Sequence, residues 1–549
     1  MSRSRKFPGM QLGVIGTKLH TLRQLQRTGI VRPMAPGRLI GLAKGLKTYG
    51  PTPAGGYAAA AGACGDRPAI IDELGVLTFG QVHRRTNALA HAFAARGIQE
   101  GDNVALLCRN HRGFVEATIA LSKLGAHALY LNTMFAGPQI TDVCAREQPT
   151  ALIYDEEFTE LCAGAGDDLQ RYVAWTDTEG PRTEETLSEL IATGDPTDVA
   201  PPEKPGRIVI LTSGTTGTPK GAARPQPKSL DPAASLFSKI PLKAHQHTMI
   251  AAPLFHSWGL AHFFLAMSLR STIVLRRRFD PEGTVAAVAE HGCSALVVVP
   301  VMLQRILDLG PETLGKYDTS SLKVIAASGS ALPGPLAIEA MDQFGEVLYN
   351  LYGSTEVAWA TIATPEDLRA APGTAGRPPH GTVVRLYDEQ GREVPQGQVG
   401  RIFVGNEMQF EGYTGGGGKE IIDGLMSSGD VGHFDEGGRL FIDGRDDEMI
   451  VSGGENVFPR EVEDLLASHD AIHEVAVLGV EDAEWGQRLV AFVVVHEEGS
   501  ITEDDMKDHV KVNLARYKVP REIIFLDTLP RNPTGKVLKR ELKDVEVQA

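Results

Sequence analysis

A loop of glycine, serine and threonine at residues 212–221 (TSGTTGTPKG) has the composition of an anion-binding site. It follows the apolar run 208–211, which predicts a buried strand. Backbone N–H groups and small hydroxyls in such a loop can surround a polyphosphate, and Lys220 supplies a mobile positive charge. The pattern differs from a Walker A loop, because two residues separate Gly214 from Gly217 and a proline precedes the lysine. A flexible linker is the alternative, but the dense threonines and the preceding strand favour a phosphate-binding loop.

Residues 352–356 (YGSTE) form a second candidate motif. Tyr352 offers a flat face on which a base can stack, and Thr355 offers a hydroxyl to a phosphate or a carboxylate. Glu356 offers a hard oxygen ligand suited to Mg²⁺. The pentapeptide alone is more typical of a surface turn, so its interpretation as a site depends on the motifs around it.

Two more segments place polar groups beside predicted buried structure. Residues 253–260 (PLFHSWGL) combine a polar edge at His256 with apolar bulk at Trp258, which suits a carboxylate on an apolar body. Ordinary packing is the alternative there, and no second histidine lies at metal-ligand spacing. Residues 328–332 (SGSAL) form a glycine turn after a predicted strand, at the kind of strand end where open α/β sheets bind ligands.

The elements that must position these motifs are strands alternating with helices, which predicts a largely parallel, doubly wound sheet. Early in the chain we expect a hairpin, a helix, a strand, a helix and two strands, at residues 68–79, 80–96, 103–108, 114–125, 126–131 and 151–154. Buried strands are also expected at residues 295–300 and 322–327. The C-terminal part predicts a compact α+β unit, with strands at 473–480, 488–496 and 522–526 and helices at 459–468 and 503–517.

The motifs and their order resemble the acyl-adenylate-forming enzymes, which include acyl-CoA synthetases, adenylation domains of peptide synthetases and firefly luciferases. The resemblance covers about residues 65–545 and is greatest to bacterial fatty acyl-CoA synthetases. It implies an α/β fold in which a large N-terminal domain with doubly wound mixed sheets is joined by a hinge to a small α+β C-terminal domain. We therefore expect a basic extension at 1–60, an AMP-binding domain at 61–445 and a mobile C-terminal domain at 446–549. After the phosphate loop the chain departs from the family pattern, so no regular helix is expected directly there.

The resemblance also implies roles for individual residues. Lys536, in a proline-rich loop, matches the catalytic lysine of the family, and it would act with Thr355 and Glu356, the latter as the Mg²⁺ ligand. The residues that would bind ATP or AMP are Thr212, Ser213, Gly214, Thr215, Thr216, Gly217, Lys220, Gly329, Ser330, Ala331, Tyr352, Gly353, Ser354, Thr355, Asp430 and Arg445. The acyl pocket would include His256, Trp258, Gly259, Gly329 and Tyr352.

Two further roles concern the smaller domain and its motion. Gly453 and Gly454 would let the pantetheine arm of coenzyme A approach, and Asp447 occupies the hinge position. The implied activity joins a carboxylic acid to AMP, releases pyrophosphate and then transfers the acyl group to coenzyme A. It requires ATP, Mg²⁺, coenzyme A and a small-molecule carboxylic acid such as a fatty acid.

Several alternatives remain open at this point. The acyl-AMP could pass to a carrier protein or a partner enzyme, as in natural-product (for example antibiotic) biosynthesis, and the acid could be aryl, terpenoid or polyketide. A non-enzymatic binding protein built on a decayed ligase and a luciferase-type oxidase are more distant alternatives. A homodimer also remains open.

Composition and charge exclude several other classes. The net charge of −15 over 549 residues disfavours nucleic-acid binding, and no stretch is long and apolar enough for a transmembrane helix. Five scattered cysteines without a CxxC pair fit a reducing cytoplasm. Residues 1–50 carry ten Lys or Arg and no acid, which leaves −25 on the rest of the chain. This arm could lie on an anionic membrane surface, although packing against the main body is the favoured interpretation.

Overall fold

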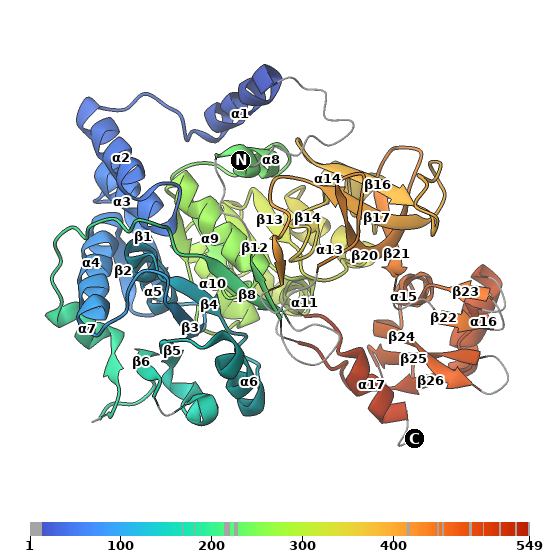
Figure 1. The fold of residues 1–549 in the computed structure, drawn as a ribbon. Coiled ribbons are helices and arrows are strands. Elements are labelled where there is room, and N and C mark those ends of the chain that lie inside the picture. The colour runs from blue at the N-terminus through green and yellow to red at the C-terminus, as the bar shows by residue number, and fades with distance from the viewer. Residues whose placement is uncertain are drawn as a thin grey trace.

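The structure is a computed structural model. It describes residues 14–166, 168–180, 182–212, 220–223, 229–413, 418–446, 450–452, 455–482, 486–497, 499–514, 518–532 and 535–546. Figure 1 shows a large body, coloured blue to light orange, with the C-terminal residues in orange and red attached at one side as a smaller unit. The expected α/β fold with a large and a small domain is confirmed.

One eight-stranded sheet of the large body carries the phosphate-loop segment, in the order β18-β9-β8-β4-β3-β5-β6-β7. Its strands from β8 to β7 run parallel, whereas β9 and β18 pair in antiparallel fashion at one edge. Helices between the strands follow the predicted alternation. The strands are β3 (Asn103–Leu107), β4 (His127–Tyr130), β5 (Ala151–Asp155), β6 (Gln170–Trp175), β7 (Glu185–Thr186), β8 (Ile208–Thr212), β9 (Lys220–Ala223) and β18 (Gly412–Tyr413). The helices are α4 (Phe79–Ala95), α5 (Arg112–Leu124), α6 (Gly137–Glu147) and α7 (Leu187–Thr193).

A second eight-stranded sheet, in the order β15-β14-β13-β12-β10-β11-β1-β2, is parallel except for an antiparallel strand at each edge. The central strands are buried along their whole length, as the apolar runs at 295–300 and 322–327 predicted. The strands are β1 (Pro68–Asp72), β2 (Gly75–Thr78), β10 (His247–Ile250), β11 (Thr272–Val274), β12 (Ala295–Val298), β13 (Val324–Ala327), β14 (Leu348–Tyr352) and β15 (Thr361–Ala363). The helices are α8 (Asp231–Phe237), α9 (Ser257–Leu269), α10 (Pro281–Glu290), α11 (Pro300–Leu307), α12 (Gly310–Leu314), α13 (Gly334–Phe344) and α14 (Pro365–Ala370).

A third, antiparallel sheet completes the large body and leads into the small domain. It contains β16 (Val383–Tyr387), β17 (Gly400–Gly405), β19 (Ile421–Ile422), β20 (Leu425–Phe434) and β21 (Leu440–Arg445). The small domain has its own sheet, in the order β23-β22-β25-β24 with β26 beside β25. Its elements are β22 (Ile450–Ser452), β23 (Glu455–Val457), α15 (Pro459–Ala467), β24 (Ile472–Asp482), β25 (Gly486–Val495), α16 (Glu503–Asn513), β26 (Glu522–Phe525) and α17 (Lys539–Glu546).

The N-terminal extension differs in part from its prediction. It forms α1 (Val14–Thr28), α2 (Pro36–Tyr49) and α3 (Pro53–Cys64), and the buried helix α3 crosses the expected boundary after residue 60. Glycines allow α2 to pack directly on α3, because a Cβ on Gly41 would lie 2.5 Å from the Gly62 carbonyl oxygen. The extension therefore packs against the main body, as favoured from the sequence. Within the described residues, none of the helices combines the length and the apolar character needed to cross a membrane.

Candidate active site

The phosphate loop joins two antiparallel strands at the edge of its sheet. Strand β8 ends at Thr212 and β9 begins at Lys220, and these two residues are cross-strand neighbours. The loop between them is therefore closed at its base by strand pairing. Ser213, Gly214, Thr215, Thr216 and Gly217 lie outside the described residues, and Thr212 and Lys220 are placed by their backbone alone. The phosphate-binding role of this loop stays a prediction.

Tyr352 and Asp430 meet from two different sheets. The Tyr352 hydroxyl donates to Asp430 Oδ2 at 2.5 Å and lies 3.1 Å from Ser428 Oγ. Burial raises the pKa of Tyr352 well above its ordinary value, and the neighbouring Asp430 charge raises it further, so the phenol stays a neutral hydrogen-bond donor. This contact fixes the end of β14 against β20.

Arg445 lies beside the same carboxylate because of strand register. Asp430 on β20 and Arg445 on β21 are cross-strand neighbours, and Arg445 Nε is 3.8 Å from Asp430 Oδ1. Burial raises the pKa of Asp430 above its ordinary value, while the Tyr352 hydrogen bond and the charges of Arg445 and Lys536 oppose that rise. A carboxylate can accept several hydrogen bonds at once, which is the property that a pair of ribose hydroxyls requires.

Lys536 reaches this cluster from the small domain. Gly535, at φ +77°, brings the loop so close to the large domain that a Cβ there would lie 2.4 Å from Val301 Cγ1. Asn532 holds the loop, because its side-chain oxygen accepts from the Lys536 N–H at 2.9 Å and its own N–H donates to the Lys536 carbonyl at 2.9 Å. Lys536 itself is exposed and its charge acts on Asp430. The structure therefore brings together Tyr352, Asp430, Arg445 and Lys536, which are far apart in sequence.

Glu356 is held by two hydroxyl groups. Tyr413 donates to Glu356 Oε1 at 2.7 Å, and Ser354 donates to Oε2 at 2.8 Å. Tyr413 lies on β18, whose partner is β9, so this contact joins the 352–356 motif to the base of the phosphate loop. A half-buried carboxylate beside that loop fits a hard cation such as Mg²⁺.

The turn after β13 lies next to the same motif. Strands β13 and β14 are parallel neighbours, so Gly329, Ser330 and Ala331 follow the first strand at the edge where Tyr352 ends the second. Gly329 takes φ +103°, and Gly329 and Ala331 are exposed. Gly353 has no room for a side chain, since a Cβ would lie 2.1 Å from the Ala358 carbonyl oxygen. The role of this edge in binding the adenine base stays a prediction.

The 253–260 segment is held by contacts that the sequence did not indicate. The Trp258 indole N–H lies 3.1 Å from the Val298 carbonyl and 3.3 Å from that of Ala326, so its polar edge bonds to the β12 and β13 backbone. Its neighbour Ser257 instead lies 3.3 Å from the Thr355 hydroxyl. His256 is half-buried at the N-terminus of α9, and Gly259 is buried where a Cβ would meet the Pro253 carbonyl at 2.3 Å. Their part in an acyl pocket stays a prediction.

Comparison with known proteins agrees with this arrangement. A family model described as AMP-binding enzyme matches residues 57–414, and its C-terminal-domain model matches residues 461–536. The chain belongs to the AMP-binding enzyme family. The resemblance inferred from the motifs is thereby confirmed.

Three relatives of this AMP-binding enzyme illustrate the family's range. This chain is 32% identical to the indoleacetate–CoA ligase of Aromatoleum aromaticum, and the match covers 85% of this chain and 93% of that one. It is 29% identical to the fatty acid–[acyl-carrier-protein] ligase ScoC of Streptomyces coeruleorubidus, over 87% and 93%. The solved o-succinylbenzoate CoA synthetase of Bacillus subtilis, in complex with its acyl-adenylate intermediate, superimposes with a TM-score of 0.77 at 27% identity, covering 89% of this chain and 98% of that one.

The hinge and the glycine pair of this AMP-binding enzyme remain predictions. Asp447, Gly453 and Gly454 lie outside the described residues. Just before them, the Asp446 N–H donates to the Gly429 carbonyl at 3.0 Å and its carboxylate accepts from Arg401 Nε at 3.0 Å. The large domain is therefore fixed up to residue 446, which leaves the predicted pivot at its end.

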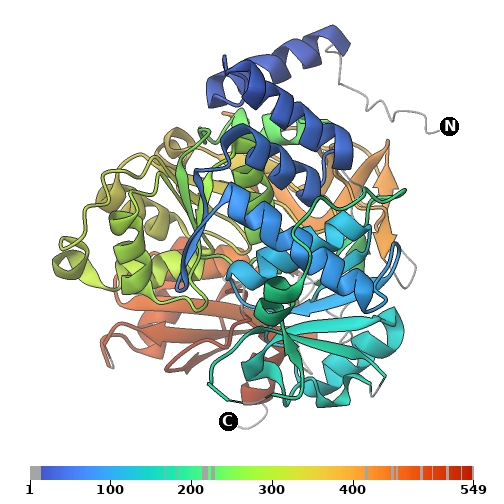
Figure 2. The same ribbon diagram turned by 90° about the vertical axis from the view of Figure 1, so that its left-hand side faces the viewer.

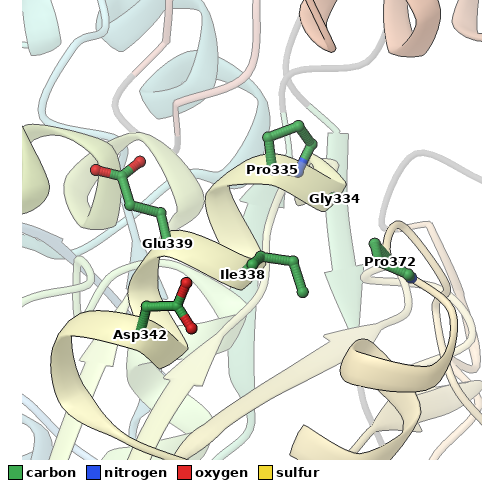
Figure 3. A pocket seen from close by; sticks show the side chains of 6 residues that line it. All are labelled: Gly334, Pro335, Ile338, Glu339, Asp342 and Pro372. Atoms are coloured by element: carbon green, nitrogen blue, oxygen red, sulfur yellow. The ribbon is translucent and has the colours of Figure 1, made fainter.

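Two other features do not belong to the site. Figure 3 shows a surface hollow between the start of α13 and Pro372, where Ile338 faces the proline; no predicted site residue lines it. Cys108, His111 and Asp155 are of metal-ligand type and close together. However, His111 Nδ1 accepts from the Gly113 N–H at 3.0 Å, and its Nε2 bonds to Asp155 at 2.7 Å. Both ring nitrogens are thus used, and the group holds the start of α5.

Sequence reasoning missed four residues that the structure adds: Ser257, Tyr413, Ser428 and Asn532. Ser257, Tyr413 and Ser428 contact the side chains of predicted site residues, and Asn532 holds the backbone of the Lys536 loop. None of the four has a residue type that marks catalysis. Ser428 and Asn532 are close in sequence to Asp430 and Lys536, so inspection of the flanking polar residues could have found them. Tyr413 carried no such signal, because its contact with Glu356 depends on how β18 pairs.

Proposed function

We propose that this AMP-forming acid–thiol ligase activates an apolar carboxylic acid, with a fatty acid as the leading candidate, and transfers it to coenzyme A. The observation that carries the proposal is the Lys536 loop, which docks on the large domain with its charge acting on the Asp430 cluster. ATP and coenzyme A are substrates in this reaction, and the Asp430, Arg445 and Tyr352 arrangement fits the nucleotide.

In the first half-reaction, a carboxylate oxygen of the acid forms a bond to the α-phosphorus of ATP. The bond between that phosphorus and the oxygen bridging to the β-phosphate breaks, and pyrophosphate leaves with its electron pair. The acid is already ionised near neutral pH, so no general base is needed. Because both reactants are anions, Lys536 offsets their repulsion and orients the carboxylate, while Asp430 holds the ribose.

Glu356 is the residue that would hold Mg²⁺, with Tyr413 and Ser354 fixing both of its oxygens. When bound there, the cation supplies positive charge to the phosphates. Thr355 lies in the same motif and presents its hydroxyl toward Ser257. These residues set the position of the phosphates relative to the Lys536 loop.

In the second half-reaction, the coenzyme A thiolate attacks the acyl carbonyl and AMP leaves. We expect the small domain to rotate about Asp447, so that Lys536 withdraws and Gly453 and Gly454 approach the acyl group. The docking of the Lys536 loop on the large domain supports the interpretation that the two domains have the relative placement needed for adenylation. A rotation is also consistent with the contacts at Asp446, which hold the chain just before the pivot.

A specific observation favours one alternative acceptor. The relative ScoC is named a fatty acid–[acyl-carrier-protein] ligase, so a phosphopantetheine arm carried by a protein is the second candidate. Other relatives are named for aryl acids, which keeps an aryl acid as the second substrate class. A homodimer and a cytoplasmic location stay predictions.

The test is an acid-dependent pyrophosphate-release screen with Mg-ATP, run with coenzyme A, with a carrier protein and with neither. We expect release with medium- to long-chain acids and an acyl-CoA product. Pyrophosphate release that yields acyl-carrier protein but no acyl-CoA would identify the carrier protein, and not coenzyme A, as the acceptor. Release with aryl acids alone would replace the substrate class, and no release with any acid would contradict the ligase proposal.

The extension supports a peripheral membrane contact as an addition to this function. Leu19 and Leu22 on α1 and Leu39, Ile40 and Leu46 on α2 are exposed, Ile40 at 68%. Basic residues accompany them, and no acid occurs before residue 66. In both views α1 and α2 lie at the end of the large domain opposite the small domain (Figures 1 and 2). Apolar side chains flanked by positive charge suit the interface of an anionic bilayer.

A further inference from the structure

A pocket of about 340 Å³ lies where the N-terminal extension meets the large domain. Arg32 and Arg38 line it from the start of α2, Arg67 from the segment after α3, and Arg270 and His245 from the chain around β10 and α9. Residues from three separate stretches of sequence thus converge on one small space. Most of its charged or titratable lining is basic.

The four arginines line the same pocket as Cys64, and the charge of each acts on its thiol. Burial raises the pKa of Cys64, and the positive charges of Arg270, Arg67, Arg32 and Arg38 all oppose that rise. Among the ion pairs of the described residues, none involves any of these four arginines. Arg67 and Arg270 donate instead to backbone carbonyls, those of His245 at 3.0 Å and Ile30 at 2.9 Å. The pocket therefore concentrates positive charge that no described carboxylate balances.

Two lining groups are shielded from water. Arg270 is only 6% exposed, and a charge so far from water is costly unless an anion or strong acceptors face it. Both ring nitrogens of His245 are shielded from solvent and make no hydrogen bond of ordinary geometry, although the Arg270 backbone lies near enough to affect the ring. Burial and the nearby arginines lower the pKa of His245 to about 4, so the ring is a neutral donor. Both groups could donate to a bound oxyanion.

The N-terminus of α2 lies on the same side of the pocket. The helix has Ala35 at its N-cap with no side-chain hydrogen bond, and its first turn contains no acid. Pro36 has no N–H, and the N–H groups of Arg38 and Leu39 donate to the Ala35 carbonyl. The start of α2 therefore contributes chiefly the positive end of the helix dipole, which favours an anion. Guanidinium groups match phosphate oxygens in particular, because they donate two parallel hydrogen bonds.

We propose that this arginine pocket binds the phosphate of an anionic phospholipid headgroup. The exposed apolar side chains of Val31, Leu39 and Ile40 lie next to the lining residues Arg32 and Arg38 in sequence, and they would contact the lipid chains. The inference rests on the membrane contact proposed above, to which it adds a defined headgroup site. It does not depend on the ligase chemistry.

The test measures binding of the full-length protein to vesicles of phosphatidylcholine with and without phosphatidylglycerol. Arg38→Glu removes a pocket cation, and Lys47→Glu makes the same charge change at an exposed position on the same helix, outside the pocket. We expect Arg38→Glu to weaken binding to the mixed vesicles at least about tenfold, and Lys47→Glu to weaken it only about twofold. Activity on a water-soluble acid without vesicles should be unchanged in both variants, which shows that both are folded.

Equal weakening by the two variants would overturn the pocket while leaving a diffuse membrane contact. Absence of vesicle binding by the unaltered protein would overturn both, whatever its ligase activity. Because the other four cysteines are buried, Cys64 reports on the pocket directly. Mixed vesicles should slow its alkylation by a maleimide, and pure phosphatidylcholine should not. Protection by glycerol 3-phosphate without any vesicle binding would overturn the lipid assignment in favour of a soluble phosphate.

Discussion

The nucleotide cluster and the arginine pocket both suit phosphate-bearing ligands, yet they are built in opposite ways. In the cluster, Asp430 faces Arg445 on the neighbouring strand and accepts a hydrogen bond from Tyr352. In the arginine pocket, Arg32, Arg38, Arg67 and Arg270 converge with no described carboxylate among them. In the first site a carboxylate faces the positive charges, and in the second no described carboxylate does.

This difference indicates how each site selects its ligand. A balanced cluster gains little from charge alone, so it must recognise a ligand by the exact placement of donors and acceptors. A pocket with unbalanced positive charge attracts any oxyanion that fits, and its affinity for that anion should fall as the salt concentration rises. Changes of geometry should therefore dominate at the nucleotide cluster, and changes of charge should dominate at the arginine pocket.

The largest effect is expected at Lys536, where the importance of geometry over charge can be tested most directly. Lys536→Ala should slow adenylation by roughly 10²–10³, the usual cost of one lost electrostatic contact to a transition state. Lys536→Arg keeps the charge but not the geometry, so it should recover only a small part of the rate. The measurement is acid-dependent pyrophosphate release.

Lys543→Ala serves as the control, because that lysine is exposed on α17. Thioester formation from supplied acyl-AMP should survive in Lys536→Ala. Full recovery by Lys536→Arg would mean that charge alone matters at this site, and the contrast with the arginine pocket would be lost.

A smaller effect is expected at Asp430. Asp430→Asn keeps the shape of the side chain but removes its negative charge. A hydrogen bond to a charged group is worth roughly 1.5–3 kcal/mol, so AMP should bind about 10- to 150-fold more weakly. Calorimetric titration with AMP measures this change. Asp435→Asn alters another Asp–Arg pair after the same strand, at 2.7 Å from Arg439, and should leave AMP affinity unchanged. An equal loss in both variants would point to a general defect of the sheet.

The pH dependence of AMP binding sharpens the same point. Burial raises the pKa of Asp430 above its ordinary value of 3.8, so this carboxylate gains its proton at a higher pH than an exposed one. In the proposed role the ionised form accepts the ribose hydrogen bonds, and AMP affinity should therefore decrease as pH falls through that raised pKa. The phosphate of AMP itself titrates at about pH 6, so the titrations use adenosine, which keeps the ribose and lacks the phosphate. Between about pH 4 and 7 they should show this acid limb in the unaltered protein and a flat profile for Asp430→Asn. An acid limb that persists in the variant would assign it to another group.

The smallest effect is expected at Tyr413, which acts only by orienting Glu356. Tyr413→Phe removes one hydrogen bond, worth roughly 0.5–1.5 kcal/mol, so the Mg-ATP requirement should shift by about 2- to 12-fold. The dependence of pyrophosphate release on Mg²⁺ concentration measures it. Tyr317→Phe breaks a similar Tyr–Glu bond, 2.8 Å to Glu282, and provides the control. No shift relative to that control would leave Tyr413 with a structural role only.

Much of the fold could be predicted from the sequence because its signals are local. Apolar runs such as 295–300 mark buried strands, and the order of motifs indicated the family before any geometry was known. Contacts that depend on register could not be predicted in this way. The placement of Arg445 beside Asp430 follows from how β20 pairs with β21, and the link from Tyr413 to Glu356 follows from a two-residue strand.

Trp258 and the arginine pocket show two further reasons. The sequence indicated apolar bulk at Trp258, but it gave no sign that the indole N–H would lie close to the carbonyls of two strands, those of Val298 and Ala326. Arg270 lies more than two hundred residues after Arg67 in the sequence, and each arginine alone is typical of a solvated surface charge. Only the packing of α2 beside the large domain brings them together.

The close packing of α2 on α3 has a mechanical consequence. A Cβ on Gly45 would lie 2.3 Å from the Ala59 backbone nitrogen, as one on Gly41 would clash with Gly62, so the two helices touch through their main chains. Helix α3 is in turn buried within the large domain. A bilayer that binds α2 would thus be connected rigidly to the large domain and not through a flexible segment. It would fix the orientation of the large domain at the surface and leave the small domain, on the far side, free to turn.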